Sequence, residues 1–147
     1  MLKKILVPTD GSKSAIKAVT YARQMLQEGI AEKITLLHVG PAIEERWGYY
    51  GLANADVELK YQCILSDEGK RILRISKRPF EEAGLPVEVI HLCGDAAETI
   101  ISYAEENKFD LIVIGSRGLN KLAELLLGSV CDRGIRLSTV PVFIVRE

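Results

Sequence analysis

The chain of 147 residues contains little cysteine and few aromatic residues, and charge of neither sign dominates it. Its three cysteines, Cys63, Cys93 and Cys131, lack C-x-x-C or Cys/His ligand spacing, which argues against structural zinc and predicts inert thiols in a reducing compartment. The 19 Lys and Arg residues against 20 Asp and Glu leave no basic excess of the kind that nucleic-acid-binding domains carry. We therefore expect no nucleic-acid partner.

Long hydrophobic runs are also missing. No stretch approaches the ~20 apolar residues that a membrane span needs, and the N-terminus shows no charged region, apolar core and cleavage site of a secretory signal. We expect a cytoplasmic protein with no membrane partner. A chain of this length buries about 70% of its unfolded surface, which predicts a single domain over residues 1–147.

Short apolar, β-branched runs alternate with amphipathic stretches, the pattern of a parallel sheet with connecting helices. Strands are predicted near residues 4–7, 33–39, 86–92, 111–114 and 142–145. Helices are predicted over 12–28, 61–83, 96–106 and 129–137, although Gly69 and Pro79 weaken the second; Ser12 is the expected N-cap and Gly84 the expected C-cap. Continuous apolar strands indicate helices on both faces, an α/β doubly wound fold with five strands.

The most informative stretch is Gly115-Ser116-Arg117-Gly118, which follows an apolar run and precedes Gly128-Ser129. Glycine permits φ > 0 and lets a ligand approach with no Cβ in the way, so that main-chain N–H groups can point at an anion. Neither the Walker loop, G-x-x-x-x-G-K-S/T, nor the dinucleotide turn, G-x-G-x-x-G, occurs in the chain. The spacing predicts a phosphate-binding loop of another kind; ordinary turn glycines and an N-cap serine are the structural alternative.

The pattern G-x2-G-x9-G-S/T resembles the nucleotide-binding signature of the universal stress protein family, in its ATP-binding branch. Further segments match that family in order: KKILVPTDGS, ITLLHV, GDAAETI, DLIVIGSRG, residues 128–130 and residues 140–145. The resemblance implies a parallel sheet of order 3-2-1-4-5 that binds ATP, accompanied by Mg²⁺ or Mn²⁺.

In a doubly wound sheet, ligands bind beyond the carboxyl ends of the strands, where the strand order reverses. The resemblance implies that Asp10 lies near ribose and phosphates, and that backbone atoms of Val39 contact adenine. The glycines and Ser129 would hold ribose and phosphates. The expected nucleotide-binding residues are Pro8, Asp10, Val39, Ile114, Gly115, Gly118, Gly128, Ser129 and Val130.

No residue is assigned a catalytic or metal-ligating role. His38 and His91 lie in or beside strands with no nucleophile paired to them, which favours a structural role. Arg117 and Lys121 either meet phosphate oxygens or are solvated loop cations; the sequence leaves both interpretations open.

The resemblance implies a nucleotide-dependent switch or sensor in the stress response. We expect at most slow ATP hydrolysis, because the chain shows no Walker lysine and no general base beside the phosphates apart from Asp10. Two alternatives stay open. A nucleotide-independent dimeric interaction module would typically lack the glycine pattern, and an ATP-cleaving enzyme of related architecture would show S-G-G-x-D-S or H-x-G-H, which Thr9-Asp10-Gly11-Ser12 is not.

Residues 140–145 form an apolar strand that the order 3-2-1-4-5 places at the edge of the sheet. An exposed apolar edge invites pairing with another chain. Antiparallel pairing with the same strand of a second copy closes both edges about a two-fold axis. We expect a homodimer through this strand, and an unidentified protein partner also stays open.

Overall fold

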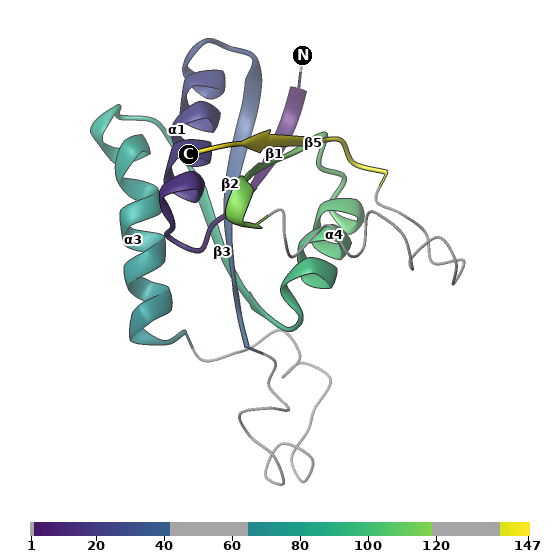
Figure 1. Ribbon diagram of the computed structural model, residues 1–147. Coiled ribbons are helices and arrows are strands. Elements are labelled where there is room, and N and C mark those ends of the chain that lie inside the picture. Colours follow the sequence, from purple (N-terminus) through teal and green to yellow (C-terminus); the bar gives the residue numbers. More distant parts are fainter. Residues whose placement is uncertain (1, 42–64, 119–138) are drawn as a thin grey trace, which may run out of the picture.

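The computed structural model describes residues 2–41, 65–118 and 139–147 (Figure 1). Strands and helices alternate along this part of the chain, as the sequence pattern predicts. The elements are β1 (Leu2–Pro8), α1 (Lys13–Gln27), β2 (Ala31–Gly40), α3 (Asp67–Glu82), β3 (Glu88–Cys93), α4 (Ala96–Glu106), β4 (Leu111–Gly115) and β5 (Val142–Val145). The predicted helix over residues 129–137 lies outside the described residues.

The five strands form one parallel sheet in the order β3-β2-β1-β4-β5, which confirms the predicted fold class and strand order. At the centre, Ile5 of β1 is paired with Ile34 of β2 on one side and with Leu111 of β4 on the other. The order reverses between β1 and β4, because the chain adds β2 and β3 on one side of β1 and β4 and β5 on the other. The carboxyl ends of β1 and β4 therefore form the switch point at which doubly wound folds bind ligands.

Helices cover both faces of the sheet (Figure 1). On one face α1 and α3 enclose a core that includes Val19 and Phe80, both fully buried. On the other face α4 encloses a second core around Ile100, Ala104 and Phe109. Central strand residues are buried on both sides, which explains why the strands read as continuous apolar runs.

Side chains at the helix starts accept the backbone N–H groups that have no partner within the helix. Ser12 accepts from Ala15 N at 3.3 Å, and Asp95 accepts from Glu98 N at 3.1 Å. After α3 the chain leaves the helix through Gly84 at φ +68°, so the predictions for Ser12 and Gly84 are confirmed. Pro79 lies inside α3 without ending it.

Asp110 fixes the amino-terminal end of the central strands. Its Oδ2 accepts from the backbone N–H groups of Lys3 and Lys4, each at 2.9 Å, and so joins the start of β1 to the start of β4. These two backbone donors hold the pKa of the Asp110 carboxyl below its ordinary value, and the N–H of Lys4 contributes more than that of Lys3. None of the helices in the described ranges has both the length and the apolar character needed to cross a bilayer.

Candidate functional site

A cavity lies at the carboxyl edge of the sheet, at the switch point between β1 and β4. Its walls come from the ends of β1, β2 and β4 and from the first turns of α1 and α4. The lining residues are Pro8, Thr9, Asp10, Ala15, Leu37, His38, Val39, Ala96, Ile100, Ile114, Gly115 and Gly118. The enclosed volume is about 60 Å³, below the roughly 300–1,000 Å³ typical of small-molecule sites, so these residues enclose only part of a ligand of nucleotide size.

Six of the nine residues expected from the sequence line this one cavity: Pro8, Asp10, Val39, Ile114, Gly115 and Gly118. They come from the carboxyl ends of β1, β2 and β4 and from the segments that follow β1 and β4. The other three, Gly128, Ser129 and Val130, lie outside the described residues. The fold therefore brings together every predicted site residue whose position the structure describes.

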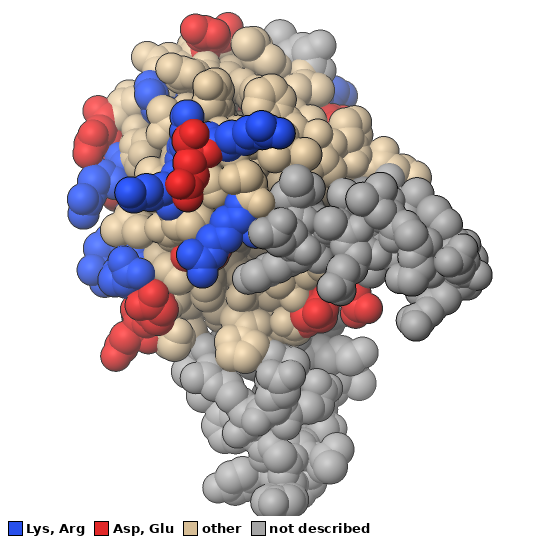
Figure 2. Space-filling view, in the orientation of Figure 1, with Lys and Arg blue, Asp and Glu red and all other residues tan. Residues whose placement is uncertain are grey.

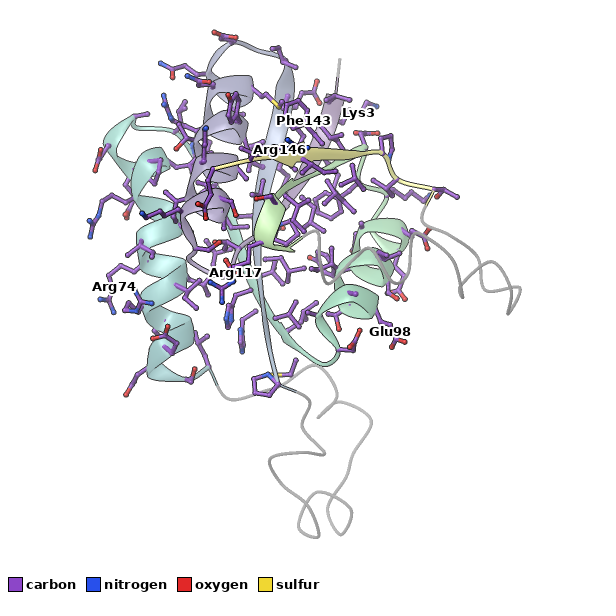
Figure 3. The ribbon with its side chains drawn as sticks, in the orientation of Figure 1. Lys3, Arg74, Glu98, Arg117, Phe143 and Arg146 are labelled. Atoms are coloured by element: carbon purple, nitrogen blue, oxygen red, sulfur yellow. The ribbon has the colours of Figure 1, made fainter. Side chains whose placement is uncertain are left out.

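Among the described residues that line the cavity, Asp10 is the one with a carboxylate. Its Oδ1 accepts from Ser12 N at 2.9 Å, which holds the turn after β1. Its Oδ2 lies 3.4 Å from Arg117 Nε. The Asp10 side chain is 30% exposed and the Arg117 side chain 71% exposed, so the cation is held loosely. Figure 3 shows Arg117 beside the carboxyl end of β4. One carboxylate oxygen is thus fixed by the backbone, while the other faces a cation that can move away.

A buried hydroxyl pair anchors the same turn to α3. Thr9 Oγ1 and Ser76 Oγ are 2.8 Å apart, and Gly11 N donates to Thr9 Oγ1 at 3.3 Å. Ser76 is fully buried, so the pair satisfies two hydroxyls that have lost water. Sequence analysis did not identify this pair, because the two residues are 67 positions apart and neither belongs to a motif.

Gly115 is required for packing. Neither Gly115 nor Gly118 takes the positive φ that glycine permits. A Cβ at Gly115 would lie 2.5 Å from the carbonyl carbon of Ser14 and 2.6 Å from Ala15 N. The missing side chain therefore lets the end of β4 touch the first turn of α1. The buried Ser14 Oγ also accepts from Arg117 N at 3.3 Å, a second contact that the sequence did not reveal.

Gly118 differs from Gly115 in what surrounds it. A Cβ at Gly118 would lie 2.8 Å from Cγ1 and Cδ1 of Ile114, a buried side chain that itself lines the cavity. A larger residue at this position would push Ile114 rather than the backbone. Gly118 therefore controls the shape of the cavity, whereas Gly115 controls helix packing.

His38 and His91 occupy paired positions on β2 and β3. Their rings stack at 5.0 Å between centroids and their Nδ1 atoms are 3.0 Å apart. His91 Nε2 lies 3.8 Å from Cys93 Sγ. Cys93 is disulfide-bonded, so the prediction of inert free thiols is wrong for this residue. Within the described part of the chain, no group of three or more His, Cys, Asp or Glu side chains is arranged to hold a metal ion.

The universal stress protein family model matches residues 1–146. The chain belongs to the universal stress protein family. Universal stress protein YxiE of Bacillus subtilis is 36% identical over 149 residues, covering 99% of this chain and 100% of that protein. Universal stress protein MJ0577 of Methanocaldococcus jannaschii is 34% identical over 160 residues, covering 100% of this chain and 96% of that protein.

Solved structures of universal stress proteins share the fold. A solved structure of MJ0577 superposes with a TM-score of 0.64 at 34% identity, covering 100% of this chain and 97% of the other. A universal stress protein in complex with cAMP superposes with a TM-score of 0.62 at 27% identity, covering 98% and 96% of the two chains. The doubly wound fold inferred from the sequence is thus that of the family.

Proposed function

We propose that this universal stress protein binds ATP at the carboxyl edge of β1, β2 and β4. The observation that carries the proposal is the convergence of Pro8, Asp10, Val39, Ile114, Gly115 and Gly118 on one cavity at the switch point. A family member at 27% identity is known in complex with cAMP, an adenine nucleotide, which supports the same ligand class.

The cavity offers two kinds of surface. The apolar contacts for a flat base come from Leu37, Val39, Ile100 and Ile114. We assign the edge of adenine to backbone atoms of Val39. Asp10 is placed to accept hydrogen bonds from ribose hydroxyls. We assign ribose and phosphates to the backbone at Gly115 and Gly118, continuing to Gly128, Ser129 and Val130.

A divalent cation, Mg²⁺ or Mn²⁺, accompanies the phosphates in this proposal. Mg²⁺ is usually held by one or two carboxylates together with phosphate oxygens and water. Asp10 is the one carboxylate among the described residues that line the cavity. A single carboxylate is enough for a cation that arrives with the nucleotide.

The protein acts as a nucleotide-dependent switch in the stress response, with hydrolysis slow or absent. Asp10 already accepts from Ser12 N and faces Arg117, so it is poorly placed to take a proton from water. With ATP and Mg²⁺ or Mn²⁺ we expect turnover far below the median enzyme rate of about 10 per second. Steady-state phosphate release near that rate, lost in Asp10→Asn, would make the protein an ATPase instead.

The binding proposal is tested by isothermal titration calorimetry with ATP and GTP. ATP should bind more tightly, because Val39 reads adenine while the glycine loop is indifferent to the base. Gly118→Val should abolish binding by driving Ile114 into the cavity, whereas Ser102→Val on the exposed side of α4 should not change it. Equal affinities for ATP and GTP, or unchanged binding in Gly118→Val, would overturn the proposal.

We also propose a homodimer through β5. β5 is the last strand of the sheet, and Phe143 and Ile144 are each 42% exposed on it (Figure 3).

The test uses the one side of β5 that does not pair with β4. Ile112 N donates to the carbonyl of Pro141, so in a parallel ladder the N–H of Val142 faces the free edge. Val142→Pro removes that donor without touching the bond to β4. Light scattering should give a dimer for the wild type and a monomer for Val142→Pro; a monomeric wild type or a dimeric variant would contradict the interface.

A further inference from the structure

A groove runs between α1 and α3 on the face of the molecule away from the sheet. It measures about 640 Å³ and lies apart from the candidate nucleotide site, with which it shares no lining residue. The α1 wall is Ile16, Thr20 and Arg23, which are spaced three and four residues apart along one helix face. The α3 wall is Ile75, Arg78, Pro79, Glu82 and Ala83.

The helices that form the groove carry a net positive charge, while the rest of the protein is net negative. α1 contains three Lys or Arg residues and no acid, and α3 contains five against four acids. The two helices are therefore +4 in a chain of net charge −1, which leaves −5 for the rest of the molecule. Blue side chains gather over these helices in Figure 2, and Arg74 points outward from α3 in Figure 3.

Most of these cations lack an acidic partner. Within the part of the chain that the structure describes, only Arg71 among the cations of α1 and α3 has a carboxylate within 4 Å, that of Glu68 at 2.8 Å. Arg23 donates to the neutral amide of Gln27 at 2.7 Å, so its charge is not compensated. Cations without an ion-pair partner here are Lys13, Lys17, Arg23, Lys70, Arg74, Lys77 and Arg78.

One backbone carbonyl of α3, that of Ile75, lacks the N–H donor that an α-helix normally provides four residues later. Pro79 has no N–H, so the carbonyl of Ile75 cannot form the hydrogen bond that the helix would otherwise provide at this position. Both residues line the groove. In the proposal below, this carbonyl is an acceptor for an N–H of the bound chain.

We propose that this groove binds an acidic polypeptide segment of a partner protein, with carboxylates on Arg23 and Arg78 and apolar side chains over Ile16 and Ile75. Arginine on both walls suits carboxylates. The apolar lining, which can bury apolar side chains, favours a polypeptide over the phosphate backbone of a nucleic acid.

The test measures fluorescence anisotropy of a labelled synthetic peptide of repeated Glu-Glu-Leu units added to the full chain. Saturable binding is expected, with much weaker binding of a Lys-Lys-Leu peptide. Arg23→Glu/Arg78→Glu should lower the affinity for the acidic peptide about 10-fold or more. Lys3→Glu/Lys108→Glu, which makes the same change in net charge at exposed positions outside the groove, should leave the affinity within about two-fold. Circular dichroism checks that each variant folds.

A separate variant tests whether the Ile75 carbonyl accepts a hydrogen bond from the peptide. Pro79→Ala supplies the missing backbone N–H, which donates to the Ile75 carbonyl and makes the helix more stable. Because that carbonyl is then no longer available to the peptide, the affinity for the peptide should fall about 2- to 10-fold. The proposal would be overturned if the acidic peptide did not bind, or if the Lys3→Glu/Lys108→Glu control lost as much affinity as the groove variant. It would also be overturned if a single-stranded oligo-dT bound more tightly than the peptide.

Discussion

The two ends of the central strands β1 and β4 each carry an aspartate, and the two carboxylates are held in opposite ways. At the amino-terminal end, one oxygen of Asp110 accepts from two backbone N–H groups, both at 2.9 Å, that belong to the strand it fixes. At the carboxyl-terminal end, Asp10 accepts one backbone N–H at 2.9 Å and faces the exposed Arg117 at 3.4 Å. The first carboxylate is tied to the fold, while the second lies beside a cation that is 71% exposed.

The glycines at the carboxyl end show the same division between folding and binding. Gly115 lies against the backbone of α1, and Gly118 lies against the side chain of Ile114 in the cavity. Parallel strands place all their carboxyl ends along one edge, so packing positions and ligand positions are neighbours there. Residue type alone does not distinguish them; the atoms around each residue do.

The largest effect is expected for Gly115→Ala. The new Cβ would meet backbone atoms of Ser14 and Ala15 at 2.5–2.6 Å, which cannot move without displacing α1. We expect a loss of about 3 kcal/mol in the free energy of unfolding, measured by urea denaturation. Gly118→Ala is the matched control and should cost less, because its new Cβ meets side-chain atoms of Ile114 and no backbone atoms. Equal losses in the two variants would remove the distinction.

Replacement of the two aspartates separates binding from folding. Asp10→Ala removes a charged acceptor from the cavity and should lower the affinity for ATP about 10- to 100-fold. The melting temperature should change little. Asp110→Ala should lower the melting temperature and leave the ATP dissociation constant unchanged, because it lies at the far end of the strands. Calorimetry and thermal unfolding on both variants decide this; weaker ATP binding in Asp110→Ala would contradict the account.

The pH dependence of stability should differ at the amino-terminal end. The folded pKa of Asp110 is depressed by backbone donors, so its stabilisation is complete above the unfolded pKa of about 4 and is lost as the pH falls through the lower folded value. As the pH falls below about 4, the wild-type melting temperature should therefore fall more steeply than that of Asp110→Asn. Parallel curves for the two proteins would show that the carboxylate does not support the fold in this way.

The smallest effect is expected for Arg117→Gln. Its ion pair with Asp10 is long and the cation is 71% exposed, so the free energy of unfolding should change by less than about 0.5 kcal/mol. Chemical denaturation of the variant beside the wild type measures this. A loss above about 1 kcal/mol would mean that Arg117 holds the carboxyl end together, as Asp110 does the other end.

The sequence was sufficient for the strands, their order, the caps at Ser12 and Gly84, and six residues of the cavity. These follow from local periodicity, local turn chemistry and the family resemblance. It did not reveal Ser14, Thr9 or Ser76, because their contacts join segments 67 and 103 residues apart. It also did not reveal the packing of Gly115 against α1, since a motif marks the position of a glycine and not the atoms around it.

The most direct test of the central claim is titration of the ¹⁵N-labelled protein with ATP and Mg²⁺, followed by backbone amide chemical shifts. The account predicts saturable shifts at the carboxyl end, in Asp10, Val39 and Gly115, while the amides of Lys3 and Lys4 at the amino end stay in place. Shifts confined to the amino end, or no saturable shift at the carboxyl end, would contradict it.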